Sequence, residues 1–306
     1  MEEQIMCKPK LAALVLLGLI LVTVTQSQAA RQINVDIYKG EIASVNSYIF
    51  SNGNSLIVMD VQRATSEAKK LAEVIKAKNL PLTHILVTHG HPDHYIGMDW
   101  LLKEFPTAKV VVANQNIKQD IIGFSTWMES VGWLDAEPAL KPKSKKNPDG
   151  FDYENNIMVL EQDTLEFEGG GALKLETNYK PAESNHATTV YVEDLNSFFS
   201  SDFGYHNIHL WMGTGVTNEH IRNWKDQLVA FETMYGDRNP TVYPGHGDPT
   251  DMRVFRNMIE YIENFQRITV NATSKEEAME KMKKLYPDYK EAGFLLKNSI
   301  DFHVRD

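Results

Sequence analysis

The sequence predicts an α/β protein. Short stretches rich in β-branched and aromatic residues alternate with amphipathic helical patterns along most of the 306 residues. Hydrophobic residues make up 42% of the chain and charged residues 24%, which is typical of a globular protein and excludes a disordered class. No Gly/Ser-rich linker follows residue 30, so we expect residues 31–306 to form a single domain.

The first 30 residues have the features of a secretory signal peptide. Lys8 and Lys10 precede an apolar run over residues 11–24, and small residues end the segment. The run is shorter than the roughly 20 residues that a membrane span requires. We therefore expect cleavage near Ala29 or Ala30, no membrane association of the mature chain, and a secreted or periplasmic location. An uncleaved N-terminal anchor is the alternative.

Cysteine usage and net charge limit the chemistry of the mature chain. The only cysteine, Cys7, lies inside the predicted signal, so a metal would have to be held by His, Asp or Glu. Acidic residues outnumber basic ones by 41 to 31, giving a formal net charge of -10. Nucleic-acid binding requires a basic surface, so we expect no nucleic-acid partner, and the net charge by itself favours no other particular partner.

The first half of the chain contains a predicted strand–helix unit that leads to a histidine. Strands at 45–50 and 56–60 flank Ser-Asn-Gly-Asn, which is typical of a hairpin. Apolar residues at i, i+3, i+4 and i+7 indicate a helix over 66–79. The next predicted strand, at 84–88, ends at His89, and ligand sites in α/β sheets collect at the carboxyl ends of strands.

The remaining elements divide the chain into two halves separated by a helical insertion at about 115–155. The insertion contains a predicted helix at 117–134 and a Pro/Lys-rich loop. Strands are predicted at 109–113, 157–176, 188–192, 197–201 and 241–243, and helices at 218–235 and 252–265. Ser274 and Glu277 form a capping box that begins a further helix, so helices are expected over about 251–306.

Four potential metal ligands lie in the six-residue run H-G-H-P-D-H that starts at His89. The glycine and the proline prevent a regular helix from continuing through the run. Such a loop can direct His89 and His91 toward one metal ion and Asp93 and His94 toward a second. Imidazole and carboxylate ligands suit zinc, and also iron or manganese.

Three further potential ligands lie next to predicted strands. His186 precedes the strand at 188–192, and Asp202 follows the strand at 197–201. His246 lies between two glycines, which allow a tight turn that directs the imidazole inward.

This pattern of ligands resembles the metallo-β-lactamase superfamily over about residues 33–250. The resemblance implies a four-layer αββα sandwich with a dinuclear metal site at one edge, here with a helical insertion and a helical C-terminal appendage. It implies that one metal ion is held by His89, His91 and His186, that the second is held by Asp93, His94 and His246, and that Asp202 bridges them. Two Zn²⁺ ions are expected, with iron or manganese as alternatives.

The resemblance also suggests a reaction and a substrate class. A divalent ion lowers the pKa of bound water and supplies hydroxide, the second ion polarises a carbonyl or phosphoryl oxygen, and Asp93 orients the attack. Dedicated β-lactamases of the superfamily have Cys or Ser where this chain has Asp202, which favours lactonase-like and glyoxalase-II-like branches. Tyr205 is similar in placement to a lactonase tyrosine that hydrogen-bonds the substrate. We therefore expect a secreted dinuclear zinc hydrolase of a lactone or β-lactam, with Asp93 and Tyr205 as catalytic residues.

Insertions in this superfamily often cover the active site, so the aromatic-rich insertion is expected to form an apolar roof. Its candidate roof residues are Phe124, Trp127, Met128, Trp133, Phe151 and Tyr153. His206, His209 and Trp211 follow Asp202 closely and are further candidates for lining the pocket.

Three other functions are weighed against this one from the sequence. A persulfide-dioxygenase-like oxidoreductase would use one iron on His89, His186 and Asp202, and metal analysis would distinguish it. A non-catalytic zinc-binding protein is disfavoured because the chain lacks a flexible His-rich tract. A tRNA-processing nuclease is disfavoured by the signal segment and the acidic composition.

Overall fold

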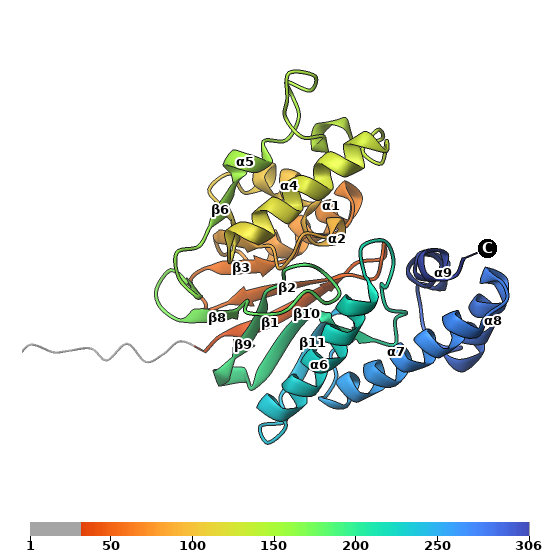
Figure 1. Ribbon diagram of the computed structural model, residues 1–306. Helices are drawn as coiled ribbons and strands as arrows, with labels where there is room; N and C mark the ends of the chain where they lie inside the picture. The colour runs from red at the N-terminus through yellow and green to blue at the C-terminus, as the bar shows by residue number, and fades with distance from the viewer. Residues whose placement is uncertain (1–31, 306) are drawn as a thin grey trace, which may run out of the picture.

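The computed structural model describes residues 32–305, so the predicted signal peptide lies outside the described residues. Within this range, two β-sheets face each other and helices cover their outer faces (Figure 1). No helix in the described range combines the length and the apolar character needed to cross a membrane.

The first sheet has six strands in sequence order. They are β1 (Asn34–Lys39), β2 (Asn46–Ser51), β3 (Leu56–Met59), β4 (Leu82–Leu86), β5 (Lys109–Val112) and β6 (Ile157–Val159). The predicted hairpin is β2 and β3, which pair antiparallel, whereas β3 to β6 pair in parallel. Parallel strands bring their carboxyl ends to one edge of the sheet, and the run that starts at His89 follows β4 at that edge.

The helices of the first half cover this sheet and include a turn built on the ligand run. They are α1 (Thr65–Ala77), α2 (Pro92–Tyr95), α3 (Met98–Glu104), α4 (Gln115–Ser130) and α5 (Tyr153–Asn156), with a 3-10 turn at Pro138–Leu140. The apolar face predicted for α1 is buried, including Leu71 and Ile75. The ligand run itself contains α2, because Pro92 has no N–H to satisfy and its fixed φ suits the first position of a helix.

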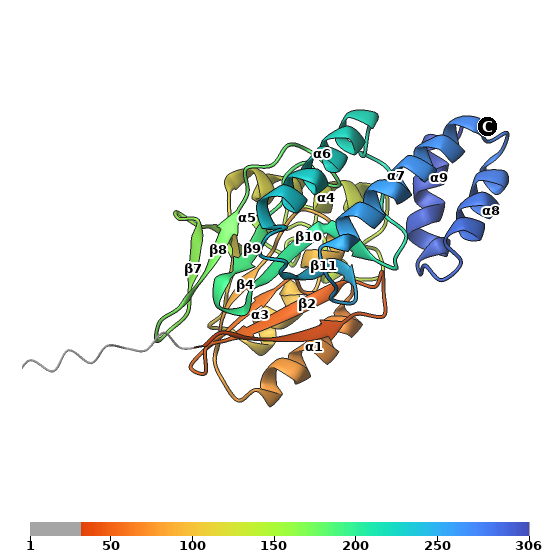
Figure 2. The same ribbon diagram turned by 90° about the horizontal axis from the view of Figure 1, so that it is seen from below.

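The second sheet has five strands in the order β11-β10-β9-β8-β7. Its strands are β7 (Thr164–Glu166), β8 (Ala172–Glu176), β9 (Thr189–Val192), β10 (Ser197–His206) and β11 (Thr241–Gly247), with a 3-10 turn at Glu193–Leu195. Its outer face is covered by α6 (Asn218–Tyr235) and α7 (Arg253–Asn271) (Figure 2). The structure thus has the helix–sheet–sheet–helix layers of the predicted αββα sandwich.

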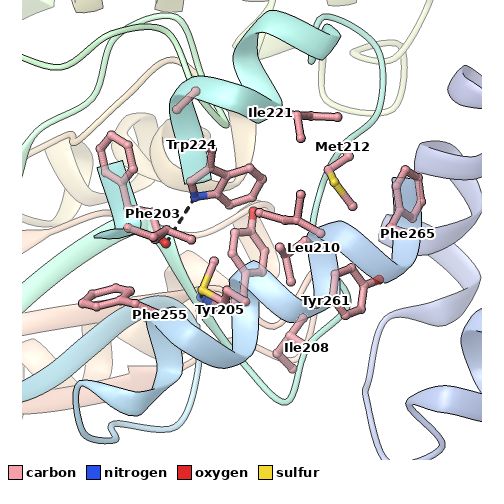
Figure 3. Close-up of a cluster of buried hydrophobic side chains, with 14 of the residues drawn as sticks. Phe203, Tyr205, Ile208, Leu210, Met212, Ile221, Trp224, Phe255, Tyr261 and Phe265 are labelled. Carbon is pink, nitrogen blue, oxygen red and sulfur yellow. Dashed lines mark hydrogen bonds between the residues drawn. The ribbon is translucent and has the colours of Figure 1, made fainter. Parts of the chain in front are cut away.

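Three apolar clusters fill the three interfaces between the four layers. Alternation along β2 sends Ile49 toward the helices of the first half and Tyr48 and Phe50 toward the second sheet. The cluster between the second sheet and its helices is the largest, and in Figure 3 the Trp224 indole donates a 3.3 Å hydrogen bond to the Phe203 carbonyl.

The C-terminal appendage packs on the same helices. It consists of α8 (Lys275–Leu285), a π-helical turn η3 (Ala292–Leu296) and α9 (Lys297–His303). Ser274 caps α8 as predicted, because its hydroxyl accepts a 3.2 Å hydrogen bond from the Glu277 amide. Leu296 and Ile300 join the cluster beneath α7, which holds the appendage against the body.

Two strands run further than the sequence pattern predicts. We expected Asp202 to follow a strand that ends at residue 201, but β10 continues to His206. The strand predicted to end at residue 243 likewise continues, as β11, to Gly247. The backbone at Ser201 has φ of +48° and the register shifts there, after which Tyr205 pairs with His246 of β11. The sequence of the β10 extension resembles a loop because it includes the polar residues Asp202 and His206.

Candidate metal centre

Pairing between the two halves of the chain brings the ligand-bearing segments together. His89 forms an isolated bridge with Ala187, and the amide of Thr188 donates a 2.9 Å hydrogen bond to the Thr88 carbonyl. His246 forms another bridge with Val45, next to β2. The carboxyl end of β4, the loop before β9 and the ends of β10 and β11 therefore meet at one edge of the sandwich.

Two adjacent groups of potential metal ligands lie at this edge. The first group is His89, His91, Glu183 and Asp202, and the second is Asp93, His94 and His246. Within each group the ligand atoms lie within 4.8 Å of one another. The structure therefore brings six of the seven predicted ligand residues together and adds Glu183.

Several of these ligand atoms are buried and lack a hydrogen-bond partner. They are Nε2 of His89, Nε2 of His94, Oε2 of Glu183 and Oδ1 of Asp202. Asp202 lies between the groups, with Oδ1 3.3 Å from Nε2 of His94 and Oδ2 3.1 Å from Nε2 of His246. Leaving such polar atoms unpaired in the interior is costly, and bound cations would satisfy them. The donor set therefore fits a metal centre.

Hydrogen bonds on the far side of three imidazole rings set their orientation. Nδ1 of His246 donates to the Ala43 carbonyl at 2.8 Å, and Nδ1 of His94 donates to Asp60 at 2.8 Å. Nδ1 of His89 lies 3.1 Å from the Thr88 hydroxyl. A carbonyl can only accept, so Nδ1 of His246 carries a proton, and Nε2 faces the site, 3.1 Å from Oδ2 of Asp202, as metal-binding histidines require.

The buried groups of the site are strongly coupled in charge. Burial lowers the pKa of His89 well below its usual value, so its imidazole is neutral. Burial opposes ionisation of Asp202, but His94 and His246 outweigh it and hold the pKa of that carboxyl well below the usual range. Burial also opposes protonation of His94 and His246, but the neighbouring carboxylates, Asp202 first, outweigh it and raise the pKa of both imidazoles. A cation that binds there would displace these protons, because imidazole acts as a ligand only in its neutral form.

The structure places Glu183, and not His186, beside His91. The Glu183 carboxylate is buried, and its Oε1 is 3.0 Å from Nδ1 of His91. His186 lies in neither ligand group and instead pairs with Asp120 of α4 through Nδ1 at 2.7 Å. Both residues are in the same loop before β9. The only feature of the sequence that could have indicated Glu183 is its position as an acidic residue directly after the apolar pair Pro-Ala.

One glycine is required for the approach of β11 to Asp202. A Cβ at Gly245 would overlap Oδ1 of Asp202, and only hydrogen fits there. This glycine therefore allows the backbone that carries His246 to lie directly against the carboxylate between the two groups.

Asp93 and Tyr205, the predicted catalytic residues, lie in different surroundings. The Asp93 side chain is partly exposed to the pocket, with Oδ2 3.5 Å from Nε2 of His246. The Tyr205 hydroxyl is buried and donates a 2.8 Å hydrogen bond to Asp202. Burial and the neighbouring carboxylates raise the pKa of Tyr205 well above its usual value, so the phenol keeps its proton.

A cavity of about 590 Å³ opens over the ligand groups. Of the predicted aromatic roof, Phe124, Trp127 and Trp133 line the cavity, together with Trp211. The remaining roof candidates, Met128, Phe151 and Tyr153, are buried in the core instead. His209 is also buried, with Nδ1 2.8 Å from the Tyr261 hydroxyl, and His206 pairs with the Asp248 carbonyl.

Comparison with known families and structures gives a consistent result. The family described as the metallo-beta-lactamase superfamily matches residues 41–246. A metallo-beta-lactamase family protein from Thermus thermophilus has the same fold, with a TM-score of 0.60 and 16% identity, over 88% of this chain and 92% of that one.

Two curated relatives match this chain over only part of their own length. The beta-lactamase-like protein 2 homolog of Caenorhabditis elegans is 22% identical over 73% of this chain and 62% of its own length. An atrochrysone carboxyl ACP thioesterase of Claviceps purpurea is 25% identical over 51% of this chain and 45% of its own length. The chain therefore spans less than two thirds of either relative.

Proposed function

The chain belongs to the metallo-β-lactamase superfamily of hydrolases, and we propose that it is an exported two-zinc enzyme that hydrolyses a small cyclic carbonyl substrate, with lactones ahead of β-lactams. The observation that carries the proposal is the pair of adjacent ligand groups whose buried nitrogen and oxygen atoms lack hydrogen-bond partners among the described residues. Export rests on the sequence of residues 1–30.

The residues present fit two divalent ions. His89, His91 and Glu183 would hold one, Asp93, His94 and His246 the other, and Asp202 would contact both. Divalent ions at such a site acidify water and polarise a carbonyl oxygen. The second group favours two metals over the mononuclear iron alternative, because a one-metal site leaves those buried imidazoles without a role.

Asp93 and Tyr205 have separate tasks in this proposal. Asp93 has the most exposed side chain of the ligand-group carboxylates that line the cavity, so it can accept a hydrogen bond from the attacking water and hold that proton. Tyr205 acts through Asp202, whose orientation its hydroxyl fixes. For Tyr205 to donate a hydrogen bond to the substrate, as the sequence predicts, its hydroxyl must turn from Asp202 toward the substrate or divide the hydrogen bond between the two.

The substrate ranking rests on Asp202, at the position where dedicated β-lactamases have another residue. Thioesters are a second candidate class, favoured by the likeness to the Claviceps purpurea protein named as a thioesterase. Both reactions transfer an acyl group to water and need the same metal chemistry.

The test is a hydrolysis screen of zinc-loaded protein against lactones, β-lactams, thioesters and phosphodiesters, with zinc content measured in the same sample. We expect two zinc ions per chain and the highest kcat/KM on a lactone. Asp202→Ala should lose both zinc and activity, whereas His84→Ala, on β4, should keep both. One bound zinc ion per chain at saturating zinc would exclude the dinuclear site. A kcat/KM for a β-lactam far above that for every lactone would reverse the substrate ranking.

Export is tested separately by the intact mass of the protein from a native-type host. The expected mass corresponds to a chain that starts at about residue 30. A mass that includes residues 1–29 would exclude cleavage.

A further inference from the structure

Two aromatic walls converge on the metal-ligand residue His91. The ring of Phe124, from α4, lies 5.8 Å from the His91 ring, and the ring of Trp211, from the segment after β10, lies 6.4 Å from it. Both rings line the cavity. The space above His91 is therefore bordered by apolar surfaces that come from opposite halves of the chain.

Each wall continues outward from the metal centre. On the α4 side, Phe124 contacts Trp127 at 5.3 Å and Trp127 contacts Trp133 at 4.9 Å. On the other side, Trp211 contacts Phe294 of the C-terminal appendage at 6.2 Å. Trp127, Trp133 and Phe294 are 41%, 49% and 37% exposed, so their rings offer apolar surface that a ligand in the cavity could cover.

A single cationic side chain, Arg63, lies at the outer end of the first wall. Its guanidinium lies 5.8 Å from the centre of the Trp133 ring, and Arg63 is the only Lys or Arg that lines the cavity. No carboxylate within residues 32–305 forms an ion pair with it.

The carboxylates that line the same cavity are engaged elsewhere. Asp93, Glu183 and Asp202 belong to the ligand groups, and Asp120 pairs with His186. The guanidinium of Arg63 is therefore available to bind a negatively charged group of a molecule that enters the cavity.

We propose that Arg63 binds a carboxylate of the substrate, carried on an apolar body that lies between the two aromatic walls while the scissile carbonyl lies at the metal centre. A guanidinium matches a carboxylate with two parallel hydrogen bonds, and the contact of Arg63 with the Trp133 ring keeps its guanidinium beside the cavity. The inference rests on the proposed hydrolytic function and narrows its substrate to carboxylated amphiphiles.

The test compares one lactone with an ω-carboxylated alkyl chain and the methyl ester of the same compound. Wild-type protein should prefer the carboxylated compound. Arg63→Met keeps the apolar stem and removes the charge, so kcat/KM for the carboxylated lactone should fall about tenfold to a hundredfold, mainly through KM, with the ester unaffected. Arg63→Lys should restore part of the loss.

A matched control is available outside the cavity. Lys69 lies over the Trp100 ring at 4.4 Å, so Lys69→Met removes a cation–aromatic contact without touching the pocket. This variant should behave as wild type with both compounds. Equal losses on both compounds in Arg63→Met, or no wild-type preference, would overturn the inference, because Arg63 would then only support Trp133.

Calorimetric binding of sebacate and its dimethyl ester to the zinc-loaded protein separates this inference from the proposed function. Weaker binding of sebacate to Arg63→Met than to wild type, with binding of the diester unchanged, supports the carboxylate site even if no lactone is hydrolysed. Equal binding of sebacate by wild type and Arg63→Met excludes it, whatever the enzyme hydrolyses.

Discussion

The phenol of Tyr205 donates a 2.8 Å hydrogen bond to Oδ2 of Asp202, and its ring stacks on His246 with 4.6 Å between the ring centres. The same tyrosine thus contacts the carboxylate between the two ligand groups and one imidazole of the second group. It is a positioning residue for the metal centre before any substrate is present.

Tyr205→Phe should therefore weaken zinc binding about tenfold to a hundredfold, as loss of a hydrogen bond to a metal ligand does. Lactone turnover at saturating zinc should fall by about a hundredfold if the phenol also donates to the developing oxyanion. Competition with a zinc indicator measures the first effect and steady-state kinetics the second. A variant with unchanged zinc affinity and reduced turnover would restrict the phenol to the substrate-donor role.

Glu183→Gln tests the proposed ligand that the sequence pattern did not identify. The change keeps the side-chain volume and removes a carboxylate beside His91. When two equivalents of zinc are added per chain, the bound zinc should therefore fall from two equivalents toward one. His186→Asn is the matched comparison from the same loop and should retain both zinc ions. The reverse result, with zinc lost only in His186→Asn, would restore the ligand set implied by the family resemblance.

Asp60→Asn tests the hydrogen bond between Asp60 and Nδ1 of His94, on the side of the imidazole ring that faces away from the proposed metal. Asp60 is buried and adopts a left-handed φ of +60°, which asparagine tolerates, so the backbone should be preserved. Both oxygens of Asp60 accept hydrogen bonds, from the amide and hydroxyl of Thr88 and from Nδ1 of His94, whereas asparagine has one acceptor oxygen. One of these contacts is therefore lost, and zinc affinity should fall about tenfold to a hundredfold if it is the contact with His94. Circular dichroism checks the fold, and parent-like zinc affinity would contradict this role.

Zinc removal should lower thermal stability, because the buried ligand atoms lose the cations that compensate them. Free zinc at a hundred times its Kd adds about 2.7 kcal/mol of stability by mass action. Calorimetric melting with zinc and with a chelator measures the difference. Asp202→Ala should abolish most of this zinc dependence, and a Tm unaffected by the chelator in wild type would argue against metal binding by the folded state.

Local patterns in the sequence were sufficient for much of the fold. The helix predicted over 66–79 forms as α1 over Thr65–Ala77, because its apolar spacing dictates which face can be buried. Ser274 caps the helix that its capping box predicts. The run that starts at His89 indicated a metal centre because four potential ligands lie within six residues, and no distant contact is needed to bring them together.

Only the tertiary structure decided which distant residues complete the centre. Glu183 and His186 lie in one loop, and the pairing of His89 with Ala187 determines that Glu183 reaches His91 while His186 reaches Asp120. The placement of Arg63 beside Trp133, and of Phe294 beside Trp211, likewise joins segments far apart in the chain. Periodicity and capping report short-range preferences, whereas these contacts depend on how the two sheets and their helices pack, which no local pattern encodes.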